Sequence, residues 1–253
     1  MITFNIITIF PKIFDSYFNE SILKRAQAKK LVKIKIWNLR DFTPKPKAGA
    51  PAAKSGLGAK RFRKVDDKPY GGGAGMIIMA EPILRAVEHI TKKDKSKRTK
   101  IVVFSAKGKP FNQKLAYDWS KKFDQIVLVS GRYEGIDERV FRILKAEEIS
   151  IGPYVLTDGE VPAMAVVSAV TRLIPGVIKL ESLKEESHWN LLLKKKEAAG
   201  TKGVEYPHYT RPEILTYKRR KYPVPKVLLS GNHKSIEDWR KSFDASTRAQ
   251  HQS

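Results

Sequence analysis

The sequence predicts an α/β protein whose core is a sheet of parallel strands. Short apolar segments alternate with longer helical segments along the chain, which is the order expected when helices connect parallel strands. Of the 253 residues, 42% are hydrophobic, which is enough for the core of one large domain, or of a large and a small one. The clearest transition lies at residues 125–140, where an apolar strand stops at Gly131 and a helix follows a charged loop.

The first half of the chain is expected to begin with a buried strand at residues 1–10, which are mostly apolar. Pro11 is typical of the first turn of a helix, which should run to about residue 29. Residues 32–37 alternate apolar and basic side chains, as a half-buried strand does. Pro82 again marks the first turn of a helix, which should end near His89.

The second half continues this alternation. Strands are expected at residues 101–105, 125–130 and 149–157, the last of which contains Pro153. Helices are expected at residues 113–123, 136–144 and 162–173. From residue 178 the sequence becomes polar and lysine-rich, and further helices are expected near residues 212–219 and from about residue 235. The chain therefore divides into a domain at 1–178, a flexible linker at 179–200 and a small, mostly helical C-terminal domain at 201–253.

The charge balance indicates a nucleic-acid partner. Lysine and arginine number 49 against 26 aspartate and glutamate residues, a formal net charge of +23, and the excess lies in local runs. Residues 44–64 hold several basic residues, no acidic one, and many proline, glycine and alanine residues, which predicts a mobile basic loop. The alternative is a lysine-rich chain whose charges only solvate its surface.

The composition also excludes several classes of site. The chain has no cysteine, which excludes disulfides and thiolate metal sites and suits a reducing compartment. Its five histidines show no metal-ligand spacing, so no metal site is predicted. The apolar N-terminus is too short to span a membrane and lacks a basic leader or a cleavage site, so a cytoplasmic protein without membrane contact is expected.

Residues 131–135 hold the most specific motif, because glycine and charge alternate there directly after a strand. Ligands of open α/β sheets gather at the carboxyl ends of strands, and glycine lets the backbone approach them. Glu134 can accept hydrogen bonds from an amine or a hydroxyl of such a ligand. The alternative is a carboxylate stabilised by the dipole of the following helix, which fits Asp137 and Glu138 better.

Two further glycine-containing segments leave their role open. Residues 71–75 can form a loop whose amides bind an anion, or a flexible hinge; no Lys-Ser or Lys-Thr pair follows, which excludes a nucleotide P-loop. Residues 154–162 form a second transition from strand to loop to helix and can place backbone groups opposite the first loop. The alternative is an ordinary connection in which Asp158 or Gly159 takes a positive φ.

Polar positions further along the chain have ordinary explanations beside functional ones. Arg172, near the end of an apolar helix, can simply cap helix carbonyls. Glu185 and Glu186 lie in a polar segment, where acidic side chains are usually solvated. Residues 207–212 mix aromatic and basic side chains between two prolines, which suits either stacking on bases or a structural turn.

Several motifs together resemble the TrmD family of bacterial tRNA (guanine-N1)-methyltransferases, in family order and over nearly the whole chain. The motifs are residues 69–73, 131–139, 150–152, 172–177 and 207–212. The resemblance implies the fold of the SPOUT superfamily, an α/β sheet with a deep trefoil knot toward its C-terminal side. It also implies a homodimer with active sites at the subunit interface. The implied reaction is methyl transfer from S-adenosyl-L-methionine to N1 of the guanosine at tRNA position 37, just 3′ of the anticodon, which supports reading-frame maintenance.

The same resemblance implies which residues form the site. S-adenosylmethionine is expected to bind, bent, against three loops at residues 103–107, 131–135 and 151–162. The cofactor-binding residues implied are Phe104, Ser105, Gly131, Tyr133, Glu134, Gly135, Ile151, Tyr154, Leu156, Gly159 and Pro162. A carboxylate must take the proton of guanine N1, and a guanidinium can stabilise negative charge on O6. Glu186 stands where the family has its aspartate base, with Glu185 as the neighbouring alternative, and Arg172 matches the family's arginine.

The chain departs from the family pattern at a few positions. It has Asp158 and Gly159 where the family commonly has two glycines, and Ser105 and Ala106 where Ser-Pro is frequent. Residues 44–64 and 191–201 look like insertions, and the first is expected to contact the tRNA backbone. Two other functions remain open, namely an RNA-binding module without catalysis and a different SPOUT reaction such as ribose methylation. Assistance by Mg2+ also remains open.

Overall fold

The computed structural model describes residues 1–43, 64–92, 97–179 and 206–242. Contacts divide the chain into two compact units, Met1–Ile178 and Lys179–Ser253, which are described separately. Within the described ranges no helix is both long enough and apolar enough to cross a membrane. The predicted basic loop lies outside the described residues except for its last residue, Lys64, and the apparent insertion at 191–201 lies wholly outside them.

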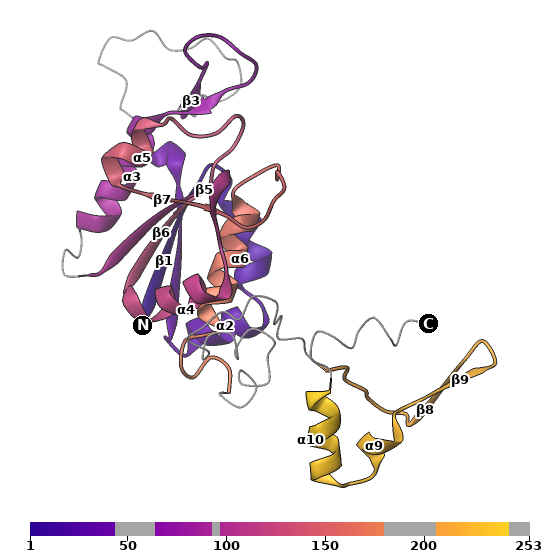
Figure 1. The fold of residues 1–253 in the computed structure, drawn as a ribbon. Coiled ribbons are helices and arrows are strands. Elements are labelled where there is room, and N and C mark those ends of the chain that lie inside the picture. The colour runs from indigo at the N-terminus through magenta and orange to yellow at the C-terminus, as the bar shows by residue number, and fades with distance from the viewer. Residues whose placement is uncertain (44–63, 93–96, 180–205, 243–253) are drawn as a thin grey trace, which may run out of the picture. The chain divides into compact units, whose positions relative to one another are not determined.

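The first unit is built on a five-stranded sheet in which all neighbouring strands are parallel, in the order β2-β1-β6-β5-β7 (Figure 1). The strands are β1 (Ile2–Thr8), β2 (Val32–Asn38), β5 (Thr99–Pro110), β6 (Gln125–Val129) and β7 (Glu147–Ser150). β1 and β6 are buried along their whole length, as expected for central strands covered on both faces. The predicted α/β class with parallel strands is therefore confirmed.

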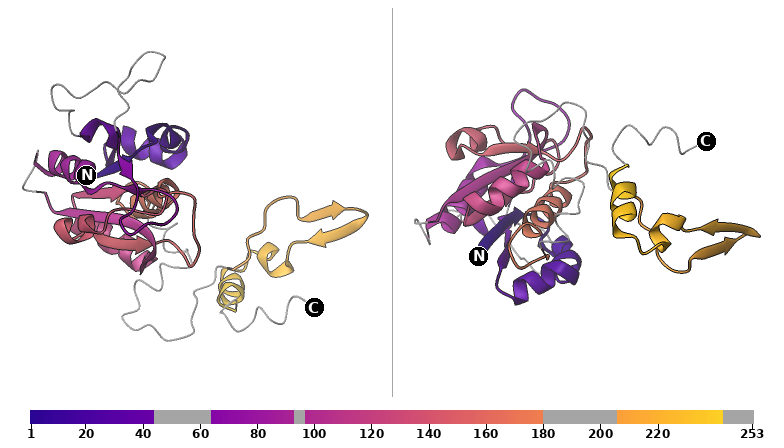
Figure 2. Two further views of the ribbon diagram at one scale, coloured as in Figure 1. Left: turned by 90° about the horizontal axis from the view of Figure 1, so that it is seen from above. Right: turned by 60° about the horizontal axis from the view of Figure 1, so that its bottom comes forward.

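Helices cover both faces of this sheet (Figures 1 and 2). α3 (Ala80–Lys92) and α5 (Arg139–Leu144) lie on one face, while α2 (Ser21–Ala28), α4 (Gln113–Lys122) and α6 (Glu160–Thr171) lie on the other. Because side chains alternate along a strand, Ile7 and Val129 join the core cluster that contains Ile83 of α3. Val166 of α6 is fully buried as well. Both faces of the sheet are thus held by packed layers.

The single helix predicted from Pro11 to residue 29 is wrong, because three shorter elements occupy that stretch. These are η1 (Pro11–Phe14), α1 (Asp15–Phe18) and α2, which begins at Ser21. The side chain of Asn19 donates a hydrogen bond to the carbonyl oxygen of Asp15 at 2.8 Å, and Glu20 is extended. Asn19 and Glu20 therefore end α1 and redirect the chain. A further short turn, η2 (Leu39–Phe42), follows β2.

β5 continues through residues 103–107, which were expected to form a loop. Its pairing with β7 shifts register between Phe104 and Lys109, so the segment forms a bulge inside the strand. A Cβ atom on Gly108 would lie 2.6 Å from the backbone nitrogen of Ile149, an approach that only glycine permits.

Other element boundaries also differ from the prediction. β7 ends at Ser150 instead of continuing through Pro153, since proline lacks the amide that a strand ladder needs. α5 begins only at Arg139, because Ile136 forms a β-bridge with Ile78. Ile78 belongs to a small antiparallel pair, β3 (Asp66–Asp67) and β4 (Ile77–Ile78).

The helix predicted at residues 212–219 is wrong. That stretch forms an antiparallel hairpin of β8 (Ile214–Tyr217) and β9 (Arg220–Pro223), whose turn residues Lys218 and Arg219 both have positive φ. Such a turn matches the twist of two antiparallel strands. Two helices follow, α9 (Lys226–Leu229) and α10 (His233–Lys241), so the described part of this unit is mixed rather than purely helical.

The two roles given for residues 207–212 both stay predictions, and the structure shows contacts to α10 from Tyr209 and from Tyr206, just before this segment. Tyr206 and Tyr209 each lie 6.5 Å, between ring centroids, from Trp239 of α10. The guanidinium of Arg240 lies 4.7 Å from the centroid of Tyr206. These contacts form a small aromatic cluster inside the second unit.

Candidate active site

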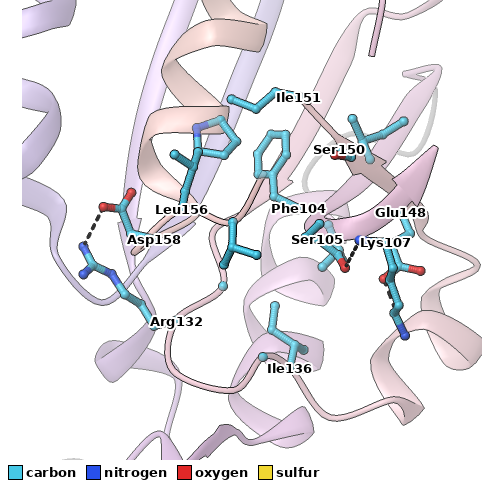
Figure 3. A pocket seen from close by; sticks show the side chains of 18 of the residues that line it. Phe104, Ser105, Lys107, Arg132, Ile136, Glu148, Ser150, Ile151, Leu156 and Asp158 are labelled. Atoms are coloured by element: carbon cyan, nitrogen blue, oxygen red, sulfur yellow. Dashed lines mark hydrogen bonds and ion pairs between the residues drawn. The ribbon is translucent and has the colours of Figure 1, made fainter. Parts of the chain in front are cut away.

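A cavity of about 310 Å³ lies where β6 and β7 end and β5 bulges (Figure 3). All residues expected to bind the cofactor line it, and they come from three separate segments of the chain. They are Phe104, Ser105, Gly131, Tyr133, Glu134, Gly135, Ile151, Tyr154, Leu156, Gly159 and Pro162. The fold thus brings together residues that are far apart in the sequence.

The first loop of the cavity follows β6 and turns sharply at Tyr133 and Gly135, whose φ angles are 59° and 125°. Its backbone is fixed on one side by β4, since Ile78 donates its amide hydrogen to the carbonyl oxygen of Gly135 at 3.0 Å. The amide of Glu134 donates to the carbonyl oxygen of Met76 at 3.1 Å. The loop is therefore positioned by the segment that follows the glycine-rich stretch.

The side chain of Glu134 lies against that stretch, at Gly75. A Cβ atom on Gly75 would lie 2.5 Å from Oε1 of Glu134, and the φ of Gly75 is +79°. Gly75 is thus favoured by its positive φ, whereas a larger residue there would only displace the flexible Glu134 side chain. The helix-start alternative fits Asp137 instead, because its Oδ1 accepts the amide hydrogen of Arg139 at 2.9 Å where α5 begins.

The second loop of the cavity comes within van der Waals distance of the first at Gly159. The amide of Gly159 donates to the carbonyl oxygen of Gly131 at 2.9 Å, and the Ser130 hydroxyl donates to the carbonyl oxygen of Gly159 at 3.2 Å. The φ of Gly159 is −92° and Asp158 has no positive φ either, so the structure does not support the alternative of an ordinary connection with a positive φ at one of these residues. Gly159 is needed for closeness instead, since its Cβ would lie 2.5 Å from the backbone nitrogen of Gly131.

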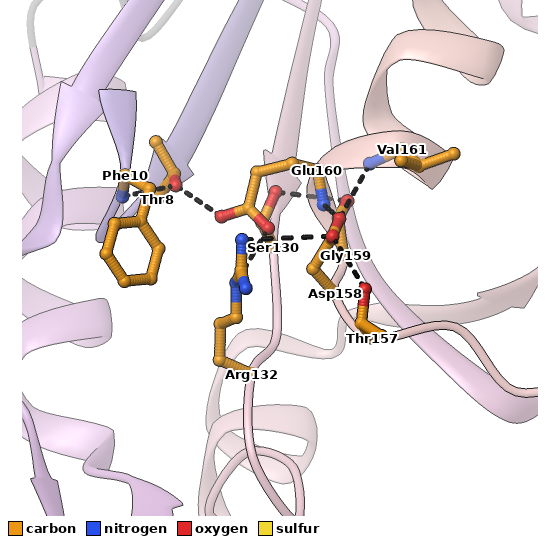
Figure 4. Close-up of polar contacts among 9 residues, drawn as sticks. All are labelled: Thr8, Phe10, Ser130, Arg132, Thr157, Asp158, Gly159, Glu160 and Val161. Atoms are coloured by element: carbon orange, nitrogen blue, oxygen red, sulfur yellow. Dashed lines mark hydrogen bonds and ion pairs between the residues drawn. The ribbon is translucent and has the colours of Figure 1, made fainter. Parts of the chain in front are cut away.

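Asp158, in the second loop of the cavity, caps a helix. Its Oδ1 accepts the amide hydrogens of Glu160 at 2.9 Å and of Val161 at 3.0 Å, in the first turn of α6 (Figure 4). Burial alone would raise the pKa of Asp158, but the Val161 amide, Arg132, the Thr157 hydroxyl and the Glu160 amide outweigh it and hold the pKa below its usual value. Asp158 therefore provides a helix cap next to the cavity.

Replacing Asp158 with alanine is expected to lower the free energy of unfolding by about 1 kcal/mol, the usual cost of losing a side-chain helix cap. Chemical denaturation followed by circular dichroism measures this change. Asp118→Ala is the matched control, because Asp118 sits in the middle of α4 and forms only an exposed ion pair with Lys122. An Asp158→Ala protein as stable as this control would contradict the capping role.

A buried ionic network lies behind the two loops and involves residues that the sequence reasoning missed (Figure 4). Glu160 has a fully buried side chain; its Oε1 accepts the Thr8 hydroxyl hydrogen at 2.5 Å and its Oε2 accepts the Nε hydrogen of Arg132 at 3.1 Å. Burial raises the pKa of Glu160, an effect that Thr8 and Arg132 oppose and Asp158 reinforces. The available signal was an acidic residue at the start of an otherwise apolar helix, where burial requires a partner.

A second polar group lies at the other end of the cavity, around Lys107 of β5 (Figure 3). Nζ of Lys107 lies 3.7 Å from Oε1 of Glu148 and 3.8 Å from Oε2 of Glu138. Together with Glu134 and Asp158, these acids outnumber the cationic side chains of Lys107 and Arg132 among the lining residues. In a chain with a formal net charge of +23, the cavity is thus locally acidic.

Of the residues expected to act in catalysis, the structure describes only Arg172. Arg172 immediately follows α6, where its amide donates to the carbonyl oxygen of Ser168 at 3.2 Å, and it is not among the residues that line the cavity. Glu185 and Glu186 lie outside the described residues. Among the residues that are described, no group of three or more His, Asp or Glu side chains is arranged to hold a metal ion.

Comparison with known proteins gives the same family along the whole chain. The model of the family described as "tRNA (Guanine-1)-methyltransferase TrmD" matches residues 2–252. A tRNA (guanine-N(1)-)-methyltransferase of Clostridioides difficile is 43% identical over 239 residues, which cover 94% of this chain and 90% of the relative. The protein of the same name from Dictyoglomus turgidum is 46% identical over 243 residues, covering 95% of this chain and 84% of the relative. The chain therefore belongs to the TrmD family of tRNA (guanine-1)-methyltransferases.

Proposed function

We propose that the protein transfers a methyl group from S-adenosyl-L-methionine to N1 of the guanosine at position 37 of tRNA, forming 1-methylguanosine. The observation that carries this proposal is the convergence of the expected donor-binding residues on one cavity in a chain of this family. Such a modification next to the anticodon supports maintenance of the reading frame. The formal net charge of +23 is consistent with a tRNA substrate.

The cavity suits S-adenosylmethionine in size and charge. About 310 Å³ lies within the range of pockets that hold small organic ligands. The donor carries positive charge on its sulfonium and amino groups, which an acid-rich lining favours, and Glu134 is the carboxylate that would accept hydrogen bonds from the amino group. Ile151, Tyr154 and Leu156 supply apolar surface for the adenine ring.

The protein's own part in the reaction is to orient the substrates and manage one proton. When bound, S-adenosylmethionine supplies a methyl group on a positively charged sulfur, so the donor needs no further activation. Glu186 takes the proton of guanine N1 as general base. Arg172 stabilises the negative charge that builds on O6 as this proton leaves.

Wider features of the family complete the proposal. The segments 103–107, 131–135 and 151–162 belong to a deep trefoil knot, and two chains form a homodimer with the active sites at their interface. Residues 201–253 bind tRNA, aided by the basic segment 44–64, and residues 179–200 act as a linker. The protein works in the cytoplasm, where its tRNA substrate is found.

The reaction is tested by identifying the nucleoside that forms. Purified protein is incubated with S-adenosylmethionine and a tRNA transcript that carries guanosine at position 37, and with a matched transcript that carries adenosine there. Digestion and mass spectrometry are expected to reveal 1-methylguanosine from the first transcript and no methylated nucleoside from the second. Equal methylation of both transcripts, or methylation of the ribose, would contradict the proposal.

A further inference from the structure

We propose that Arg132 and Glu160 form a latch behind the cavity that fixes the separation of its two loops, which makes Arg132 a positioning residue for the methyl donor. The latch consists of the Arg132–Glu160 ion pair and its contacts to Thr8 and Phe10. The proposal that the cavity holds S-adenosylmethionine underlies the role in donor binding, whereas the latch itself is a property of the protein without ligand.

The buried carboxylate of Glu160 has a hydrogen-bond donor for each of its oxygens. The Glu160 side chain is 0% exposed, and each of its two carboxylate oxygens has its own donor, the Thr8 hydroxyl and the Arg132 Nε. A buried carboxylate without such partners would be costly, so this arrangement constrains all three side chains. Thr8 is at the end of β1, so the carboxylate is held against an inner strand of the sheet.

Arg132 is itself held by contacts with Phe10 and Asp158. The side chain of Arg132 is 18% exposed, and its guanidinium carbon lies 4.6 Å from the ring centroid of Phe10. Its Nη2 atom lies 3.8 Å from Oδ2 of Asp158 (Figure 4). A planar guanidinium can lie flat on a ring while its N–H groups point in fixed directions toward a carboxylate, a geometry that the rounder ammonium of lysine does not reproduce. Arg132 thus joins the first loop to both the second loop and the chain that follows β1.

The latch lies directly beside the point where the two loops meet. The backbones of the loops meet at Gly131 and Gly159, and Arg132 and Glu160 are the next residue on each side. Tyr133 follows Arg132 directly and has a φ of 59°, a conformation that a non-glycine residue keeps only when its surroundings hold it there. Tyr133 and Glu134 both line the cavity, so their placement depends on how firmly Arg132 is anchored.

The ion pair between Arg132 and Glu160 is better explained by geometry than by folding stability. A buried ion pair often contributes no more to folding than apolar side chains of similar volume would, because desolvation of the charges offsets their attraction. Stability alone therefore gives little reason for an ionic contact at this place. Directional contacts do fix geometry, and the geometry fixed here is that of the two loops around the cavity.

The proposal predicts a specific pattern for Arg132→Lys, which keeps the charge but loses the planar fork. The Kd and KM for S-adenosylmethionine are expected to rise about tenfold, the size of effect found when a residue supporting a binding group is lost. The KM for tRNA should stay within about twofold, and kcat at saturating donor should change less than the KM for the donor. Calorimetry and steady-state kinetics give these values.

Hydrogen exchange of the protein without ligand tests the latch independently of the donor. Peptides covering residues 131–136 and 157–162 should exchange faster in Arg132→Lys than in the unaltered protein, as segments that have lost a tertiary contact do. Glu160→Gln should accelerate the same peptides, and adding it to Arg132→Lys should have little further effect, because one contact is lost in both.

Arg98→Lys is the matched control. The guanidinium of Arg98 donates two hydrogen bonds to the carboxylate of Asp124, at 3.0 and 2.9 Å, but neither residue lines the cavity. This variant should leave the donor Kd and the exchange of both peptides unchanged. Unchanged exchange in Arg132→Lys and Glu160→Gln, or an unchanged donor Kd despite faster exchange, would overturn the proposal. Absence of any donor binding by the unaltered protein would instead contradict the proposed function, and the exchange data would still decide whether the latch exists.

Discussion

Replacing Glu186 with glutamine is expected to lower kcat by about 10²- to 10⁴-fold, the usual contribution of a general base. Glutamine has nearly the same size as glutamate and can still form hydrogen bonds, but it cannot take the proton from guanine N1. The donor does not depend on this proton, so the Kd for S-adenosylmethionine should stay nearly unchanged. Single-turnover methylation of the guanosine-37 transcript, combined with calorimetry of donor binding, measures both quantities.

Glu185→Gln is the matched control, since it removes the neighbouring carboxylate and leaves Glu186 in place. This variant should retain most of the activity. The opposite result, with an active Glu186→Gln protein and an inactive Glu185→Gln protein, would move the role of base to Glu185. Full activity of both variants would place the base elsewhere in the protein.

Replacing Gly159 with alanine is expected to separate the two loops of the cavity. The added Cβ atom would lie 2.5 Å from the backbone nitrogen of Gly131 and 2.8 Å from the Cα of Ser130, and backbone atoms cannot move aside as a flexible side chain can. We expect the free energy of unfolding to fall by about 3 kcal/mol, in the upper part of the range for overpacking. Donor affinity should fall by about 10²-fold, because displacements near 1 Å have effects of that size. Thermal unfolding and calorimetry measure the two changes.

Gly131→Ala is the matched control for the stability part of this prediction. Its Cβ atom would meet the side chain of Ile136 at 3.6 Å, which is an ordinary van der Waals distance. The unfolding midpoint of Gly131→Ala should therefore stay close to that of the unaltered protein. If Gly159→Ala is as stable as this control and binds the donor normally, the close approach of the loops is not required.

Most strands of the sheet could be predicted from their pattern of apolar residues. β1 and β6 are buried on both faces, so their sequences are apolar nearly throughout, whereas β2, at the edge of the sheet, alternates apolar and basic residues. The continuation of β5 through its bulge could not be predicted, because it depends on the close contact of Gly108 with Ile149 on another strand.

The two errors in the helix predictions have local physical causes. The stretch after Pro11 has a helical composition, but the side-chain hydrogen bond of Asn19 to the carbonyl of Asp15 ends α1 early. At residues 214–217, isoleucine, threonine and tyrosine favour a strand. This preference outweighs the helix propensity of the lysine and arginine residues that follow.

The candidate site was predictable where its residues stand in compact motifs. The glycine-containing loops at 131–135 and 154–162 indicated a ligand site, and the resemblance to the family supplied the identity of the ligand. The Arg132–Glu160 pair was not predictable, because the two residues belong to different motifs and meet only when α6 packs beside β1. The cap that Asp158 forms on α6 is local instead, and an aspartate directly before an apolar helix is a sequence signal for it.

The hydrogen bond between Thr8 and Glu160 joins residues that lie 152 positions apart. During translation, β1 leaves the ribosome long before β6, its central partner, and longer still before the start of α6. A nascent chain shorter than this distance would expose the apolar β1 with one edge unpaired, which is the kind of segment that aggregates or recruits chaperones. The cavity, whose second loop leads into α6, is consequently one of the last features of the first unit to form.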